Sequence, residues 1–297
     1  MELYYTDHFV LPLPTGHRFP MSKYVLLRDQ ISTFASTRLH EAPAASDNEL
    51  TLAHSSDYVR RVVDGALTAK EQREIGFPWS PEMVERSRRS AGATIAACRS
   101  ALSHGCGANL AGGTHHAHVD KGSGFCVFND SVIAPRVLQR EGLIRRALVV
   151  DLDVHQGNGT AAILRHDPSI YTFSVHGKKN FPFRKEPSDR DIELDDDTGD
   201  EFYLSVLATA LPQVMAAARP DLVIYLAGAD PLAADRLGRL SLSLAGLRAR
   251  DELVFQQCDA AGVPIAISMG GGYAEPIELT VAAHTQTLRH AVQRYCS

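Results

Sequence analysis

The sequence lacks the features that mark a disulfide-stapled, nucleic-acid-binding or membrane protein. Its five cysteines include no Cys-x-x-Cys pair, so we expect reduced thiols in the cytoplasm rather than a disulfide framework or a cysteine zinc site. The net charge of −5 argues against a nucleic-acid partner, because such proteins usually carry a basic stripe. No apolar run approaches the roughly 20 residues of a membrane span, and the N-terminus lacks the basic-then-apolar order of a signal peptide.

The chain also contains no internal repeat, low-complexity tract or long linker. A hydrophobic content of 44% with 22% charged residues is typical of globular proteins. A length of 297 residues would suffice for two domains, but α/β folds of this size often form one. We therefore expect a single domain over residues 1–297.

Apolar periodicity alternates between strand-like and helix-like segments. Apolar or small-residue runs predict strands at 107–111, 147–153, 170–175, 221–227 and 264–269. Periods near 3.6 residues predict helices at about 21–36, 80–104, 129–141, 200–218, 243–261 and 275–294. Strands that alternate with helices favour an α/β fold, in which a parallel sheet has helices on both faces.

The least regular segment runs from Gly177 to Gly199. Its first half is basic, and three aspartates at 195–197 follow. A solvated loop and turn is the better interpretation of such a charge run. The basic residues are Lys178, Lys179, Arg184 and Lys185.

The most informative segment is 151–155, which follows the apolar run 147–150. Buried parallel strands deliver residues to the carboxyl edge of a sheet, where open α/β folds bind ligands. Alternation along the strand points Asp151, Asp153 and His155 to one side. Two carboxylates and an imidazole at a buried edge need compensation, and this mixed set suits zinc or iron better than calcium or magnesium. A hydrogen-bonded polar strand end is the alternative.

A second apolar run, 221–229, ends in Asp230. If the two strands are neighbours, Asp230 can supply a third protein ligand beside Asp153 and His155. Two carboxylates and one histidine leave one tetrahedral position open for water, as in catalytic zinc sites.

Adjacent histidines follow a glycine pair, Gly112 and Gly113, after a small-residue strand. In a loop over the site, either His115 or His116 could take a proton from water and return it to a leaving amine. The other imidazole could stabilise developing negative charge. Alternatively, one or both bind metal, or they are ordinary loop histidines. No role is assigned to His118.

Three glycines after the strand at 264–269 bring Tyr273 to the same edge. Glycine permits positive φ and close backbone approach. The phenol could donate a hydrogen bond to an oxyanion as it forms. A tyrosine packed on its ring, with its hydroxyl in water, is the alternative.

Together, these segments resemble the zinc-dependent histone deacetylase and acetylpolyamine amidohydrolase superfamily, which has an arginase-like fold. The matching motifs, in the order of the family, are Gly112–Ala117, Gly124–Asp130, Asp151–Thr160, Ala227–Asp230 and Gly270–Tyr273. Further segments resemble the class IV branch: Gly76–Ser80, Gln156–Gly159, Asp235–Ser241 and Arg250–Phe255. With Gly16–Met21 near the start, the resemblance covers nearly the whole chain.

The resemblance implies two cation sites. Asp153, His155 and Asp230 would bind Zn²⁺, with Fe²⁺ as the other candidate in the cell. An inner potassium site would use mostly backbone carbonyls. Its residues would be Asp151, Asp153, His155, Ser174 and Val175.

For catalysis, the resemblance implies that His116 is the main general base and acid. His115 would be an electrostatic helper paired with Asp151, and Tyr273 would polarise the scissile carbonyl. Many family members have an aspartate behind the second histidine, where this chain has Asn158. A neutral amide orients the imidazole but stabilises its protonated form less. The class IV branch shares the asparagine, so we do not interpret it as inactivating.

The resemblance also implies a tunnel that admits the acylated side chain. Phe125 would form one wall and Phe181 the other, with Gly124 and Gly271 along the tunnel. In this family the loop 177–199 lies at the tunnel mouth, so its basic half is a candidate for substrate contact. Leu237 matches the gatekeeper position, where an acylpolyamine deacetylase would need an acidic residue.

The sequence thus predicts a zinc hydrolase that removes acetyl or longer fatty acyl groups from lysine, in a protein or peptide. A deacetylase of acetylpolyamines or other small N-acyl amines is the main alternative. An arginase-like ureohydrolase would need two manganese sites, and a silent acyl-lysine reader would be expected to lose a ligand or the tyrosine. The class IV resemblance favours medium or long acyl groups over acetyl. The oligomeric state does not follow from the sequence.

Overall fold

The computed structural model describes residues 1–296, so Ser297 of the predicted domain lies outside the described residues. Eight parallel strands form one sheet in the order β2-β1-β3-β8-β7-β4-β5-β6. In chain order they are β1 (Leu3–Tyr5), β2 (Leu39–Glu41), β3 (Cys106–Asn109), β4 (Ala147–Asp151), β5 (Ile170–Gly177), β6 (Arg190–Leu194), β7 (Leu222–Leu226) and β8 (Ile265–Ser268).

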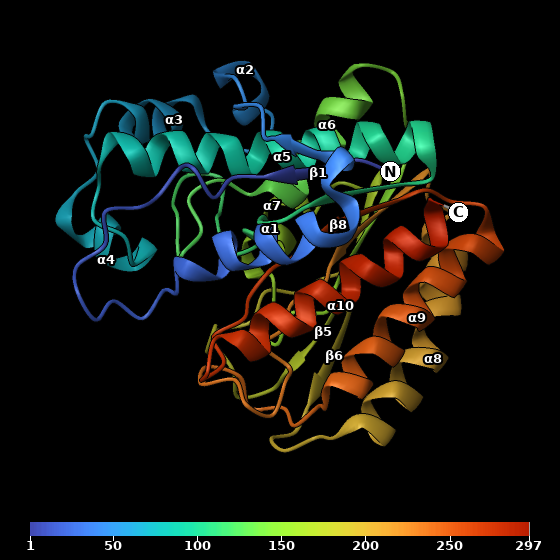
Figure 1. Cartoon of the computed structure of the whole chain (residues 1–297). Coiled ribbons are helices and arrows are strands. Elements are labelled where there is room, and N and C mark those ends of the chain that lie inside the picture. The colour runs from blue at the N-terminus through green and yellow to red at the C-terminus, as the bar shows by residue number, and fades with distance from the viewer. Residues whose placement is uncertain (297) are drawn as a thin grey trace.

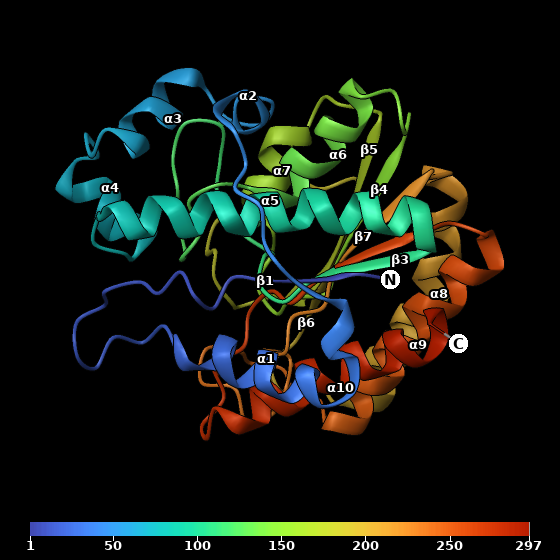
Figure 2. The same cartoon turned by 45° about the horizontal axis from the view of Figure 1, so that its top comes forward.

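Helices cover both faces of the sheet (Figures 1 and 2). One layer contains α5 (Pro81–His104), α6 (Asp130–Arg140) and α7 (Asn158–Leu164), with the short helices α2 (Asp47–Leu50), α3 (Ser56–Val63) and α4 (Ala69–Ile75) beside it. The other layer contains α1 (Ser22–Ala35), α8 (Asp200–Ala218), α9 (Leu244–Ala261) and α10 (Glu278–Tyr295). The predicted α/β architecture is therefore confirmed.

Alternating residues of the central strands divide the core into two clusters. Along β4, Leu148 and Val150 pack with the helices α1, α8, α9 and α10. Their neighbours Ala147 and Val149 pack with α5 and α6 instead. This alternation follows from the two-residue period of a strand, and because both faces are covered, every residue of β4 is apolar until Asp151.

Local signals fix the long helix that crosses one face of the sheet. The hydroxyl of Ser80 caps α5 by accepting a hydrogen bond from the backbone N–H of Met83, and Pro81 occupies the first turn, where a missing N–H costs nothing. Gly105 ends the helix with a φ of 80°, a conformation that glycine adopts without strain. The chain then turns directly into β3.

The six predicted helices and five predicted strands agree with the observed elements to within a few residues. Three strands were missed, namely β1, β2 and β6. The prediction that 177–199 is only loop and turn was wrong at Arg190–Leu194, which pairs in parallel with β5. β6 lies at the sheet edge and is only partly buried, so it lacks the apolar run that marks the central strands.

Helix α8 is, within residues 1–296, the one helix whose length and composition would also suit a membrane span. Here it packs Tyr203, Leu207, Leu211 and Val214 into the core. Buried core helices share this length and apolar character. The expectation that the chain has no membrane span stays a prediction.

His54, between α2 and α3, ties the outer helices to the loop that follows β3. Its Nδ1 lies 2.8 Å from the carbonyl oxygen of His118, and its Nε2 accepts from the backbone N–H of Asn129 at 2.8 Å. The neutral ring with a proton on Nδ1 satisfies both contacts. Burial lowers the pKa of His54 to about 4.

Because the pKa of His54 falls from 6.5 in the unfolded chain to about 4 in the folded one, acidification favours the unfolded chain between those values. We predict that His54→Gln is less stable than wild type at pH 7.5 but that the gap narrows by about 2 kcal/mol at pH 5. Urea unfolding at the two pH values measures this. The same difference in unfolding free energy between the two proteins at both pH values would contradict it.

Candidate active site

Five adjacent strands, β3, β8, β7, β4 and β5, point their carboxyl ends at one edge of the sheet. The ends of these strands lie level in the sheet. Asp151 at the end of β4 pairs with Leu226 of β7 on one side and with Ser174 of β5 on the other. Leu226 in turn pairs with Ser268 of β8. The segments that follow these strands therefore meet. β4 and β7, the strands that lead to Asp153 and Asp230, are neighbours, as the metal-site prediction required.

Asp153, His155 and Asp230 form a buried group whose ligand atoms all lie within 4.8 Å of one another. The Nδ1 atom of His155 lies 3.0 Å from Oδ1 of Asp153 and 3.1 Å from Oδ2 of Asp230. These are the three residues that the sequence analysis proposed as metal ligands. Within residues 1–296 no other group of this kind is found.

The surroundings of this group fit a divalent cation. Two buried carboxylates face one imidazole, which leaves an excess of negative charge that a cation would balance. Glycines make room on the other side: a Cβ at Gly271 would lie 2.0 Å from Oδ2 of Asp230, and one at Gly228 would lie 2.7 Å from Oδ2 of Asp153. The backbone N–H of Gly271 donates to Oδ2 of Asp153 at 2.7 Å.

Arg250 of α9 holds the two ligand-bearing segments together from behind. Its guanidinium donates to the carbonyl oxygens of Gly228 at 2.6 Å and Leu152 at 3.4 Å. Its own charge is balanced by Asp251 at 2.8 Å, and both side chains are buried. Sequence reasoning gave this pair no role, because only the packing of α9 on the sheet brings it beneath the site.

His115 is held as a protonated or proton-sharing imidazole. Its Nδ1 lies 2.7 Å from Oδ2 of Asp151, and its Nε2 lies 3.9 Å from Oδ1 of Asp153. Burial disfavours its charged form, but the two carboxylates outweigh burial and raise the pKa of His115 to about 9. The predicted pairing of His115 with Asp151 is present in the geometry.

His116 has the opposite electrostatic setting. Its Nδ1 lies 2.8 Å from Oδ1 of Asn158, so the amide oxygen accepts the Nδ1 proton and leaves Nε2 as the basic atom. Burial, reinforced by the neighbouring His115 and His155, lowers the pKa of His116 well below its usual value. Neutral His116 is therefore available to accept a proton.

His118 lies on the far side of the Asn158 amide. Nδ2 of Asn158 is 3.2 Å from Nε2 of His118, which fixes the amide with its oxygen toward His116. The sequence analysis assigned His118 no role. The position of His118 in the sequence, two residues after His116, does not predict this contact. The contact depends on the place of Asn158 in the fold, at the start of α7.

The Gly-Gly-Thr-His-His loop is anchored by Asp130 at the start of α6. Its carboxylate accepts from the backbone N–H groups of Gly113 at 3.0 Å and Thr114 at 2.7 Å. It also accepts from the hydroxyl of Thr94 on α5 at 2.6 Å. These hydrogen bonds fix the backbone of the two residues that precede His115.

Tyr273 is positioned by Asp235, which accepts the tyrosine backbone N–H at 2.6 Å. Asp235 also accepts the N–H groups of Leu237 and Gly238 at 2.8 Å. Burial, with the carboxylates of Asp153 and Asp230 second, raises the pKa of the Tyr273 phenol well above its usual value. The phenol therefore stays protonated and can donate.

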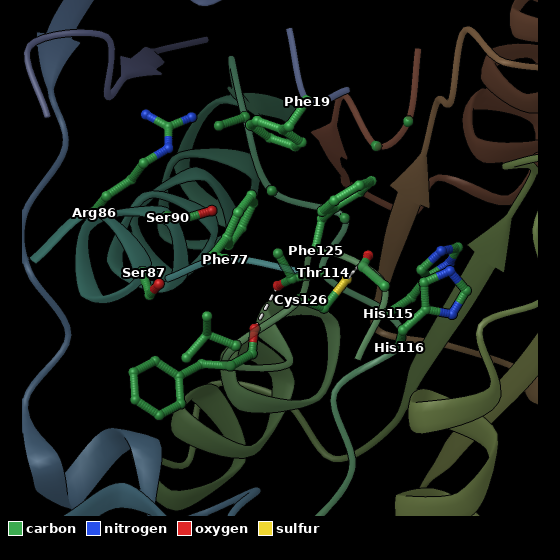
Figure 3. A pocket seen from close by; sticks show the side chains of 18 of the residues that line it. Phe19, Phe77, Arg86, Ser87, Ser90, Thr114, His115, His116, Phe125 and Cys126 are labelled. Carbon is green, nitrogen blue, oxygen red and sulfur yellow. Dashed lines mark hydrogen bonds between the residues drawn. The ribbon is translucent and has the colours of Figure 1, made fainter. Parts of the chain in front are cut away.

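A small inner cavity of about 70 Å³ borders Asp153 and His155 of the metal-ligand group. Figure 3 shows the rings of Phe19, Phe77 and Phe125 gathered near one side of it, with His115 and His116 toward the other. Lys23, which is 3% exposed, also lines the cavity. Its ammonium lies 5.1 Å from the ring centre of Tyr273 and donates to the carbonyl oxygen of Gly272 at 3.3 Å.

A larger cavity of about 750 Å³ forms the outer mouth and includes Phe125, Phe181 and Leu237. The ring of Phe181 packs edge-on against His116, with centroids 4.9 Å apart. A Cβ at Gly124 would lie 2.7 Å from the His116 ring and 3.1 Å from that of Phe181. The predicted tunnel residues therefore line one opening, except Gly271, which lies deeper, against the carboxylates.

The residues proposed for a potassium site lie at the adjoining ends of β4 and β5. Asp151 pairs in register with Ser174, and Val175 is buried beside it. The hydroxyl of Ser174 lies 2.8 Å from Nδ1 of His176. The backbone N–H of Asp153 donates to Oδ1 of Asp151 at 3.2 Å. The arrangement brings the proposed residues together, and the ion itself stays a prediction.

Comparison with known proteins places this site in a family. A histone deacetylase domain matches residues 17–288. An uncharacterised protein of Picosynechococcus sp. (strain ATCC 27264 / PCC 7002 / PR-6) is 44% identical over 98% of both chains. Histone deacetylase 2 of Arabidopsis thaliana is 30% identical over 82% of this chain and 65% of its own. The acetoin utilization protein AcuC of Bacillus subtilis (strain 168) is 30% identical over 86% and 73%, respectively.

Solved structures share the fold. The crystal structure of the HDA15 HD domain matches with a TM-score of 0.82 at 20% identity, covering 98% of this chain and 91% of that one. The structure of an HDAC homolog from Aquifex aeolicus matches with a TM-score of 0.81 at 23% identity, covering 96% and 82%. With the family match over nearly the whole length, these findings show that the chain belongs to the histone deacetylase family.

Proposed function

We propose that this deacetylase is a zinc-dependent hydrolase that removes acyl groups from lysine side chains. The observation that carries the proposal is the convergence of three elements: the Asp153, His155 and Asp230 group, the neutral His116 and the protonated Tyr273. The family membership supports a deacetylase, and the free cysteines fit a cytoplasmic location. The likeness of several motifs to class IV enzymes is part of the same proposal.

Asp153, His155 and Asp230 would hold the metal, which would polarise the scissile carbonyl and lower the pKa of the attacking water. Nε2 of His116 accepts the proton of that water, because its Nδ1 proton is engaged by Asn158. The Tyr273 hydroxyl donates to the oxygen that gains negative charge. His116 then returns the proton to the leaving amine, while His115, paired with Asp151, assists electrostatically.

The alternatives receive less support from the site. An acylpolyamine substrate carries further ammonium groups, yet the gatekeeper position holds the apolar Leu237. A ureohydrolase needs two metal-ligand groups, and residues 1–296 contain a single one. A silent acyl-lysine reader has no need of the complete set of ligands, histidines and tyrosine present here.

For the metal, we predict one zinc per chain in the purified wild-type protein and its loss in Asp230→Ala. Removing one of three protein ligands leaves the ion two, and a catalytic zinc site needs three. Elemental analysis of the purified proteins, with circular dichroism as a control for folding, measures this. Stoichiometric zinc in folded Asp230→Ala would rule out Asp230 as a ligand.

For catalysis, we predict that Tyr273→Phe folds, keeps its zinc and loses about 10²–10³-fold in kcat on an acyl-lysine peptide. The phenyl ring preserves the packing with Phe125 and Lys23 while the donor is removed. Steady-state kinetics with metal content measured on the same samples tests this. A loss below about threefold would make Tyr273 a packing residue.

For the acyl group, we propose that a medium or long chain is cleaved more efficiently than acetyl. The supporting observation is that Leu11, Phe19, Phe77 and Val127 line one part of the inner cavity, whose lining also includes Lys23, Arg86 and Ser90. Each methylene of the acyl chain that is buried there adds about 0.8 kcal/mol to the binding free energy. The cavity volume is only about 70 Å³, so longer chains require these rings to move.

The acyl-length prediction is a higher kcat/KM on octanoyl-lysine than on acetyl-lysine in otherwise identical peptides, below any micelle-forming concentration. Part of the gain would lower KM alone, because binding that is equal in ground and transition states does not raise kcat. A myristoyl peptide and acetylated spermidine complete the series. Equal or better activity on acetyl-lysine would point to a closed cavity behind the metal ligands.

A further inference from the structure

The outer mouth carries an excess of positive charge, although the whole chain has a net charge of −5. Six ionisable side chains other than histidine and tyrosine line it, and five of them are cationic. They are Arg18, Arg73, Glu74, Lys179, Arg236 and Arg239. The mouth therefore has the opposite sign to the protein as a whole.

Carboxylates in the vicinity neutralise only part of this charge. Lys179 and Arg239 share the single carboxylate of Asp196, at 3.3 and 3.2 Å. Arg236 lies 3.2 Å from Glu275, and both side chains are more than half exposed. Asp196 and Glu275 therefore offset two of these three positive charges, and one remains in excess.

Two of the cations have no ion-pair partner within residues 1–296, namely Arg18 and Arg73. Arg18 lies in the loop before α1, and Arg73 lies in the last turn of α4. The single anion of the rim, Glu74, is itself 3.8 Å from the ammonium of Lys70. Arg18 and Arg73 are therefore available to bind a negatively charged ligand at the mouth.

The positive side chains stand on opposite sides of the opening. The carbonyl oxygen of Glu74, next to Arg73, accepts the backbone N–H of Gly124 beside the Phe125 wall. Lys179 belongs to the segment that carries the Phe181 wall, and Asn180 ties that segment to the Leu237 carbonyl oxygen at 2.8 Å. A chain entering between the two walls would meet positive charge on both sides.

The lip beside the opening is aromatic and exposed. Phe183 is 86% exposed and Phe181 36% exposed, and both line the mouth. Their rings pack edge to face, with centroids 6.4 Å apart. Large exposed aromatic side chains beside a cleft commonly mark a contact surface for a partner.

We propose that the natural substrate presents its acyl-lysine within an acidic segment, with aspartate or glutamate within about two residues on either side. This inference rests on the proposed deacylase function and specifies its substrate class. An extended peptide advances about 3.3 Å per residue, so flanking side chains fall over the rim when the acyl-lysine enters the tunnel. The same charges disfavour lysine-rich segments and acylated polyamines at the entrance.

The test compares three peptides that carry the same acyl-lysine and the same aromatic reporter. Their two residues on each side are glutamate, glutamine or lysine. We expect kcat/KM at low salt to be about five- to thirtyfold higher for the glutamate peptide than for the lysine peptide. The preference should shrink strongly in about 0.5 M salt, where the Debye length falls to about 4 Å. Acetylated spermidine should be cleaved no better than the lysine peptide.

Charge-reversal variants assign the effect to the rim. Arg18→Glu and Arg73→Glu, made separately, should each reduce the preference for the glutamate peptide several-fold, mainly through KM. Arg248→Glu is the matched control, because Arg248 is exposed on α9 and does not line the mouth. The control changes the net charge by the same amount and should keep the preference.

The possible outcomes separate the two proposals. Equal cleavage of the three peptides would overturn the acidic-substrate inference and leave the deacylase function intact. An equal loss of preference in Arg248→Glu would also overturn it, because the effect would then follow net charge. Failure of the zinc-loaded protein to cleave any of the peptides would reject the deacylase function, and the inference with it.

Discussion

The structure depends on holding two buried carboxylates, Asp153 and Asp230, side by side. Their mutual repulsion and loss of hydration are unfavourable unless positive charge and hydrogen bonds compensate. The chain supplies His155 between them and backbone N–H donors from Gly271 and Val154, while Arg250 holds the two segments together from behind. A divalent cation would complete this compensation at the carboxyl edge, where the parallel sheet, its register and its glycine-lined turns bring these groups together.

The same edge gives two adjacent histidines opposite protonation behaviour. A carboxylate, Asp151, stands behind His115 and raises its pKa, whereas a neutral amide, Asn158, stands behind His116. In the proposed mechanism, His115 assists electrostatically and His116 accepts protons. Both rings are buried, and the carboxylates beside His115 outweigh burial, whereas the amide behind His116 does not.

Sequence reasoning found what local pattern encodes. β4 and β7 were predicted because buried strands of a parallel sheet are apolar throughout, and Asp153, His155 and Asp230 followed because they end such runs. β1 and β2 were missed because each has three residues, and β6 because its edge position leaves it polar. His118, Asp235 and Arg250 were not assigned roles, since their contacts join segments far apart in the chain. The basic rim likewise gathers residues from four separate segments.

The most direct measurement of the central claim is a metal titration with two readouts. The protein is stripped with a chelator, and zinc is returned in known amounts while bound metal and hydrolysis of an acyl-lysine peptide are followed together. If Asp153, His155 and Asp230 form the catalytic metal site, both signals rise in parallel and stop at one zinc per chain. Full activity of the stripped protein, or one zinc bound without any hydrolysis, would contradict this account.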